Sequence, residues 1–214
     1  METIHIPGLT FEAGIRHLTI ADAEACQIVE NDAFTNPNYR ATPEKACRNP
    51  FRYRLTHYPD LCLGLFLKAP ANAVLDGKLL PSPSSDSTSE SGGKWTLVCH
   101  IIASRSANPV ISDGDMEVPA GWTPDPSSAR TGSMAALHSF ACVHAAQGKG
   151  LGRQLMANYV QRMTRAPDVE LIALLCQDHL LGVYTSMGYT RSHTESLATF
   201  GGGGWNDMIL ETKS

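Results

Sequence analysis

The stretch from Val143 to Val160, VHAAQGKGLGRQLMANYV, places three glycines within five residues and then becomes strongly helical. Glycine weakens the start of a helix, so this concentration of glycine needs another reason. A helix N-terminus presents unpaired N–H groups and the positive end of the helix dipole, which attract anions such as phosphate. Glycines let the backbone approach a pyrophosphate, and Lys149 and Arg153 add positive charge. The stretch therefore predicts a pyrophosphate site in front of a helix over residues 150–165.

Two common phosphate loops do not fit this stretch. A nucleotide P-loop requires G-x-x-x-x-G-K-[ST], whereas Gly152 is followed by Arg153 and Gln154. A Rossmann turn comes early in a β-α-β unit, whereas this loop lies in the second half of the chain. A glycine-rich turn that binds no ligand is the remaining alternative, because G-x-G patterns in isolation often mislead.

The rest of the chain alternates between strand and helix patterns. Strands are predicted over residues 14–20, 61–69, 94–106, 132–143, 169–176, 188–194 and 205–212. Helices are predicted over residues 21–34, 43–57, 150–165 and 179–187, with Pro50 breaking or kinking the second one. The helix after the glycine loop has its apolar residues on one face: Leu151, Leu155, Met156, Tyr159 and Met163.

Two long insertions interrupt this pattern. Residues 71–93 are rich in Ser, Pro and Gly, which predicts a disordered insertion between two strands. The loop over residues 106–130 keeps several apolar side chains, and we expect it to pack against the rest of the protein: Val110, Ile111, Met116, Val118 and Trp122. At 214 residues the whole chain, 1–214, fits one globular domain.

Composition excludes several classes of function. Hydrophobic content of 43% and charged content of 18% are typical of a soluble enzyme. A net charge of -4 predicts no general attraction to nucleic acid or to anionic membranes. The apolar runs are too short to cross a bilayer, and the N-terminus lacks the pattern of a secretory signal, so we expect a cytoplasmic protein. We further expect a monomer or a weak homodimer.

The cysteines and histidines show no spacing typical of a site. The six cysteines are scattered without a C-x-x-C pair, which predicts buried free thiols in a reducing compartment. Histidines such as His100, His144 and His179 lack metal-ligand spacing, and we expect no metal.

The residues from Gln147 to Gly152 match the Q/R-x-x-G-x-G/A motif, and the chain here resembles the GNAT superfamily of N-acetyltransferases. The resemblance implies an α/β (α+β) single-domain GNAT fold, with a mixed central β-sheet of about seven strands flanked by helices and a splayed motif strand. It also implies that the loop cradles the pyrophosphate of acetyl-CoA, the acetyl donor. The coenzyme-binding residues carried over are Phe140, Ala141, Cys142, Gln147, Gly148, Lys149, Gly150, Leu151, Gly152, Arg153 and Tyr184.

Three segments, VENDAF, LHSFACV and LLCQDHLLGVYTSMGY, resemble the arylalkylamine (serotonin) N-acetyltransferase branch, including fungal polyamine and arylalkylamine acetyltransferase relatives. In that branch two histidines spaced H-x-H form the proton path from the amine. His138 falls on the second position, whereas Ala136 occupies the first. The tyrosine of the short helix corresponds to Tyr184.

The chemistry assigns a role to each of these side chains. Aliphatic amines titrate near the lysine value of about 10.4, so a group such as His138 has to remove a proton before the amine attacks. Water or Glu30 completes that path, although a plain exposed helix carboxylate is the favoured interpretation of Glu30. Tyr184 is placed to protonate the leaving thiolate. For His138 and Tyr184 the alternative is a core side chain, and for Cys142 a small buried residue is favoured over an acetyl acceptor.

The acceptor site is described least well by the sequence. The residues expected to form an apolar slot for an aromatic amine are Phe34, Pro37, Phe140 and Leu175, with the loop around Trp122. Acidic residues equally suit a polyamine, or both groups are loop surface: Asp113, Asp115 and Glu117. The resemblance therefore implies acetyl transfer to a small primary amine. The alternatives are acetylation of a protein N-terminus or lysine, and a non-catalytic acetyl-CoA-binding protein.

Overall fold

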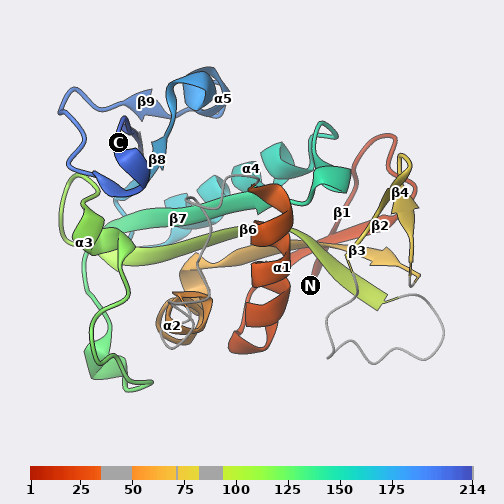
Figure 1. The fold of residues 1–214 in the computed structure, drawn as a ribbon, viewed down its shortest axis with the longest axis horizontal. Coiled ribbons are helices and arrows are strands. Elements are labelled where there is room, and N and C mark those ends of the chain that lie inside the picture. The colour runs from red at the N-terminus through yellow and green to blue at the C-terminus, as the bar shows by residue number, and fades with distance from the viewer. Residues whose placement is uncertain (35–49, 71, 82–93, 214) are drawn as a thin grey trace.

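The computed structural model of the chain describes residues 1–34, 50–70, 72–81 and 94–213. Its centre is an eight-stranded mixed sheet with the order β1-β2-β3-β6-β7-β8-β10-β9 (Figure 1). The strands are β1 (Glu2–Ile4), β2 (Glu12–His17), β3 (Leu63–Ala69), β6 (Lys94–Ser106), β7 (Met134–Cys142), β8 (Leu171–Cys176), β10 (Asn206–Glu211) and β9 (Thr190–Arg191). All neighbours are antiparallel except β7 and β8. The expected mixed sheet is confirmed, with one strand more than predicted.

Helices cover both faces of this sheet (Figure 1). The helices are α1 (Ala23–Ala33), α2 (Pro50–His57), α3 (Asp113–Met116), α4 (Leu151–Arg165) and α5 (Leu181–Thr185). Single 3-10 turns cover Ile20–Asp22, Pro59–Leu61, Pro126–Ser128, His144–Ala146, Asp178–Leu180 and Phe200–Gly202. Helices α1 and α2 lie on the face opposite to α4, so the glycine loop in front of α4 and the side chains of α1 approach β7 from opposite sides.

Proline begins the second helix instead of breaking it. Among the described residues α2 starts at Pro50, where the missing N–H and fixed φ of proline are tolerated. Residues 43–49 of the predicted helix lie outside the described part of the chain. The predicted apolar face of α4 is confirmed, because all five of its members are buried: Leu151, Leu155, Met156, Tyr159 and Met163.

The first insertion contains an ordered hairpin, so the prediction of disorder is wrong for residues 72–81. Strands β4 (Val74–Leu75) and β5 (Lys78–Leu79) pair around Asp76 and Gly77, which both have positive φ. An Asp-Gly pair in this conformation is a common two-residue hairpin turn. Side chains on the hairpin and beside it are buried, which anchors it to the core: Ala73, Leu75 and Leu80. Residues 71 and 82–93 lie outside the described part of the chain.

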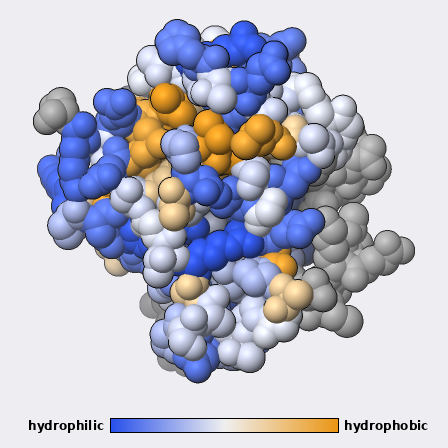
Figure 2. Space-filling view, turned by 90° about the vertical axis from the view of Figure 1, so that its left-hand side faces the viewer, coloured by the Kyte–Doolittle hydropathy of each residue, from blue (hydrophilic) through white to orange (hydrophobic). Residues whose placement is uncertain are grey.

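The second insertion packs against the protein, as expected. Ile111 is fully buried in a small hydrophobic cluster with Met134, Ala136 and Ala173. The ring of Trp122 lies 5.4 Å from that of Tyr53 on α2. Figure 2 views the side of the molecule that carries α3; hydrophobic residues gather in the upper part of that face, with hydrophilic residues around them.

Candidate active site

The sheet opens between β7 and β8. These parallel strands are paired only from Met134–Leu137 to Leu171–Leu174, although β7 continues to Cys142 and β8 to Cys176. Beyond Leu137, β7 therefore has no strand partner on its β8 side among the residues that the structure describes. This is the splayed motif strand that was expected, and its exposed edge includes Phe140, Ala141 and Cys142. Free backbone groups on such an edge are able to pair with an extended ligand.

His138 is the extra residue of a β-bulge at the point where the strands separate. Ile102 of β6 is opposite Ser139 and the next residue, Ala103, is opposite Leu137, which leaves His138 without a cross-strand partner. A bulge bends its strand and redirects the side chain at that position. The sequence contains His138 but no signal for the bulge, since the bulge depends on the register of two strands.

The imidazole of His138 is held as a neutral group. Its Nε2 lies 2.6 Å from Oγ of Ser104, and its Nδ1 is buried without a hydrogen-bond partner among the described residues. Burial, followed by the positive charges of Arg54 and Arg130, lowers the pKa of His138 well below its usual range. A neutral imidazole with an unoccupied ring nitrogen is able to accept a proton.

Glu30 is buried and hydrogen-bonded, so the favoured interpretation as an exposed helix carboxylate is wrong. Ser139 Oγ donates a 2.5 Å hydrogen bond to Glu30 Oε2, and His100 Nε2 lies 2.8 Å from the same hydroxyl oxygen. His100 is fully buried and Glu30 is 7% exposed. The packing of α1 on β7 creates this cluster, and sequence reasoning missed Ser139 and the role of His100. No local spacing links positions 30, 100 and 139.

The glycine loop has the geometry expected of an anion cradle. Gly148 and Gly150 have φ of 74° and 77°, and Gly150 caps the N-terminus of α4. A Cβ added at either position would meet no atom within 4 Å, so space is open above the loop. A Cβ at Gly152 would instead lie 3.2 Å from Cys142 Sγ and from Phe140, so this glycine allows α4 to pack on β7. Gln147 Nε2 donates a 2.9 Å hydrogen bond to the carbonyl of Cys142, which ties the loop to the strand.

The two basic residues of the loop have protein partners. Lys149 forms an ion pair with Asp76 at the turn of the β4–β5 hairpin. Arg153 donates hydrogen bonds to the carbonyl and hydroxyl of Ser186, at 3.2 and 2.9 Å. The contact with Asp76 places the first insertion next to the candidate pyrophosphate site, which its sequence did not indicate. Exposed ion pairs are weak, so a phosphate is able to compete for Lys149.

Tyr184 lies on helix α5, which follows β8 in the chain. Its ring centroid is 6.4 Å from that of Phe140 on β7 and 5.9 Å from that of Tyr189. Burial raises the pKa of Tyr184 well above its usual value, so the phenol stays protonated and is able to donate a proton or a hydrogen bond. The structure therefore brings Tyr184 to the strand that carries His138.

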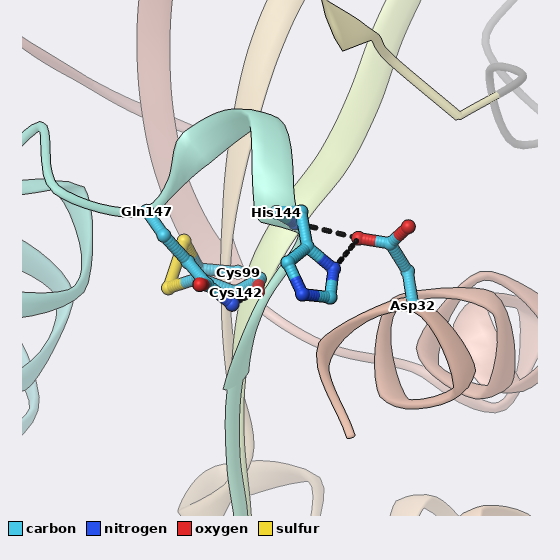
Figure 3. Close-up of a disulfide and its surroundings, with 5 residues drawn as sticks. All are labelled: Asp32, Cys99, Cys142, His144 and Gln147. Carbon is cyan, nitrogen blue, oxygen red and sulfur yellow. Dashed lines mark hydrogen bonds and ion pairs between the residues drawn. A yellow bond between two sulfur atoms is a disulfide. The ribbon is translucent and has the colours of Figure 1, made fainter. Parts of the chain in front are cut away.

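Two of the cysteines form a disulfide below the glycine loop (Figure 3). Cys99 and Cys142 are directly opposite each other on β6 and β7, so strand register brings their side chains together. The prediction of free thiols is wrong for this pair, and Cys142 has no thiol to accept an acetyl group. Cys26, Cys62 and Cys176 are buried free thiols, as expected. Cys47 lies outside the described residues.

The same region connects the loop to α1. Figure 3 shows Asp32 of α1 beside His144, with Gln147 next to the disulfide. Asp32 accepts hydrogen bonds from the backbone N–H of His144, at 2.5 Å, and from its ring, at 3.3 Å. The end of α1 and the start of the glycine loop are thereby held together.

The residues predicted for the acceptor site are only partly brought together. Phe140 and Leu175 are half-buried on β7 and β8, and Phe34 is half-buried where α1 ends, whereas Pro37 lies outside the described residues. The acidic loop residues have structural roles that the sequence did not indicate. Asp115 is buried and accepts hydrogen bonds from Ser106, Ser112 and Asn108. Asp113 binds the backbone and hydroxyl of Thr199.

Two further features are missing from the described ranges. No group of three or more His, Cys, Asp or Glu side chains that could hold a metal ion occurs within them. Nor is any helix of the described part of the chain long and apolar enough to span a bilayer.

The chain belongs to the family described as "Acetyltransferase (GNAT) domain", whose sequence model matches residues 105–211, half of the chain. No curated protein gives a sequence match. Among solved structures, the GphF GNAT-like decarboxylase in complex with isobutyryl-CoA is similar with a TM-score of 0.60 and 16% identity, over 93% of this chain and 99% of that one. The PaiA N-acetyltransferase from Thermoplasma acidophilum in complex with coenzyme A has a TM-score of 0.55 and 14% identity, over 93% and 98%.

A third similar structure is the ribosomal-protein-S18-alanine N-acetyltransferase from Escherichia coli, with a TM-score of 0.51 and 14% identity, over 94% and 95% of the two chains. At such identities these likenesses establish the fold and nothing finer. The arylalkylamine branch and the identity of the acceptor therefore remain to be argued from the site itself.

Proposed function

We propose that this member of the acetyltransferase family transfers the acetyl group of acetyl-CoA directly to a small primary amine in a ternary complex. The acceptor class is an arylalkylamine, such as serotonin or tryptamine, or a polyamine. The observation that carries the proposal is the bulge at His138, which places a neutral imidazole where β7 separates from β8.

The donor is bound on the side of the sheet that carries α4. The open space over Gly148 and Gly150 accommodates the pyrophosphate, which accepts hydrogen bonds from the first N–H groups of α4. The pantetheine amides pair with the free edge of β7 at Phe140, Ala141 and Cys142. This placement brings the thioester near His138, because the edge becomes free directly after Leu137.

His138 and Tyr184 carry out the proton transfers of the reaction. His138 takes the proton of the bound ammonium group, and this proton leaves through water. The neutral amine nitrogen then attacks the thioester carbonyl carbon and the C–N bond forms, and the tetrahedral adduct gives up a second N–H proton to the same nitrogen of His138. Collapse of the adduct breaks the C–S bond and expels the thiolate of coenzyme A. Tyr184 donates its phenolic proton to that thiolate, and solvent restores the proton.

Glu30 is the third side chain to which we assign a role in this scheme. It is bound to Ser139, the residue next to His138, from the face that carries α1 and α2. We assign it to the path by which the proton leaves His138, through water, in place of the histidine that Ala136 does not supply.

The test is a panel of amines in an assay of thiol release from acetyl-CoA. The panel contains serotonin, tryptamine, phenylethylamine, putrescine and spermidine, together with a peptide that has a free N-terminus and a lysine. Faster thiol release with a small amine, and the matching N-acetyl product by mass spectrometry, are the expected results. Acetylation of the peptide alone would contradict the proposed substrate class. If nothing is acetylated, calorimetry with acetyl-CoA decides whether the chain binds the donor without catalysis.

A further inference from the structure

A cleft of about 600 Å³ lies at the end of the sheet where β10 begins. It is formed by the connection between β9 and β10 and by the start of β10. Its polar and aromatic lining includes Ser192, Thr194, Glu195, Trp205, Asn206 and Asp207. None of these residues was identified by the sequence analysis as part of a site.

Asp207 is the unusual member of this lining. Asp207 is 2% exposed, and its Oδ1 accepts a 3.2 Å hydrogen bond from the backbone N–H of Ile111. Oδ2 is buried and has no hydrogen-bond partner among the described residues. A buried carboxylate oxygen without a donor or a cation is costly, so this oxygen lacks the partner that such groups normally have.

Strand register relates Asp207 to the proposed catalytic centre. Asp207 is directly opposite Leu175 on β8, and the β7–β8 pairing ends at Leu137 and Leu174, the residues directly before His138 and Leu175. Asp207 accepts a hydrogen bond from Ile111, and Leu175 packs against the cluster that contains Ile111. His138 is bonded to Ser104, which is directly opposite Ala136, a member of the same cluster.

We propose that this cleft is a subsite for a second positive charge on the amine acceptor, with Asp207 as its counter-ion. The inference rests on the proposed function and selects di- and polyamines over arylalkylamines. With one amino group at His138, an extended alkyl chain passes over Leu175 and carries the next ammonium group to Oδ2 of Asp207. The ammonium donates the hydrogen bond that Oδ2 lacks, and Trp205, which also lines the cleft, offers an aromatic face to a cation.

The basic residues of the cleft are compatible with this assignment. Arg191 is opposite Met208, the neighbour of Asp207 in β10, so its side chain leaves the sheet on the other face. His193 and Glu195 are both exposed, so water and salt screen any charge at these two positions. Asp207 is a buried carboxyl group among the described residues of the cleft, and interactions at a buried site are screened least.

The experiment compares kcat/KM for spermidine and for octylamine, an uncharged-tail amine of similar length, in the wild type and in Asp207→Asn. Asparagine keeps an oxygen for the N–H of Ile111 but replaces the free carboxylate oxygen with an amide. We expect the ratio of kcat/KM for spermidine to kcat/KM for octylamine to be at least about tenfold lower in Asp207→Asn than in the wild type. This is the effect of losing one charge-assisted hydrogen bond. Glu211→Gln, an exposed charge removed at the far end of β10, is the matched control and should leave the ratio unchanged.

The outcomes separate this subsite from the proposed function. An unchanged ratio in a folded Asp207→Asn protein, or a wild type that prefers octylamine, overturns the subsite while amine acetylation stands. If the wild type acetylates no amine, the proposed function fails, and calorimetry with spermidine decides the subsite: binding weakened by Asp207→Asn supports it, and absent binding overturns it. If Asp207→Asn does not fold, the wild type is compared on a series of α,ω-diamines and the 1-aminoalkanes of the same lengths. A higher kcat/KM for the diamine above one chain length supports the subsite, and equal values at every length overturn it.

Discussion

Ser139 Oγ donates a 2.5 Å hydrogen bond to Glu30 Oε2, and this contact joins the first helix to the strand that carries His138. Glu30 is 7% exposed, so its charge acts through protein and not through bulk water. The bond places a buried carboxylate one residue away from the proposed base. Its neighbour His100, fully buried beside Ser139, completes a cluster on the side of the sheet that carries α1, opposite to α4 and the glycine loop.

Replacing Glu30 with Gln should lower kcat on the order of tenfold while leaving KM for acetyl-CoA unchanged. Glutamine keeps an acceptor for Ser139 but removes the negative charge that we assign to the proton path. Steady-state kinetics with a reactive amine measure the effect. Glu24→Gln removes an exposed charge from the same helix and is the control. Equal kcat values for both variants would exclude Glu30 from the path.

The pH dependence of kcat should have its acid limb well below pH 6.5, because burial and the charges of Arg54 and Arg130 lower the pKa of His138. His138 is then neutral at pH 7, and its capacity as a base is lost only as pH falls through that lowered pKa. Arg130→Gln removes a positive charge that disfavours the imidazolium, so the pKa rises and the acid limb moves to higher pH. Arg165→Gln, exposed at the end of α4, should not move it.

The variant His138→Ala tests directly whether His138 is the group that gives the acid limb of the pH dependence of kcat. The variant should lose activity and lose the acid limb together, since the titrating group is gone. A pH–rate profile of unchanged shape in His138→Ala would assign the limb to another group and remove His138 from the mechanism.

Gly150→Asp should weaken acetyl-CoA binding by at least about tenfold, which calorimetry measures directly. The added carboxylate enters the open space of the cradle and repels the pyrophosphate. The control is Gly121→Asp, because Gly121 has a similar φ of 68° and also faces open space, but lies in the loop over residues 106–130. Both variants carry the same backbone strain, so an equal loss of affinity would show that strain, and not phosphate repulsion, is responsible.

Tyr184→Phe should lower kcat with little change in the affinity for acetyl-CoA, because it removes the proton donor but keeps the buried ring. A loss on the order of tenfold to hundredfold is expected for one general acid. Tyr189→Phe is matched in burial and lies next to Tyr184. If both variants lose activity equally, the hydroxyl of Tyr184 has no special role in expelling the thiolate.

Reduction of the disulfide between Cys99 and Cys142 should lower the free energy of unfolding by about 2–4 kcal/mol, because it releases a cross-link between residues 43 apart in the sequence. We also expect a higher KM for acetyl-CoA, since Gln147 of the loop is bound to the carbonyl of Cys142. Denaturant melts and kinetics with and without dithiothreitol measure both effects. A protein with both cysteines replaced by serine should not respond to dithiothreitol; a full response there would contradict the assignment.

The sequence alone determined the features that are local along the chain. The G-x-G loop, the apolar face of α4 and the bounds of β6 were all predicted correctly, because glycine spacing and helix or strand periodicity are carried by residues within a few positions of one another. The motif in that loop also identified the family. Burial of Ile111 in the second insertion followed from its apolar composition.

Only the tertiary structure decided which distant residues meet. The bulge at His138 and the pairing of Cys99 with Cys142 are consequences of register between β6 and β7. The contact of Glu30 with Ser139 and the unpartnered Oδ2 of Asp207 depend on how a helix and a loop pack on the sheet. Register and packing are set by the summed burial of many side chains far apart in sequence, so no short stretch of residues encodes them.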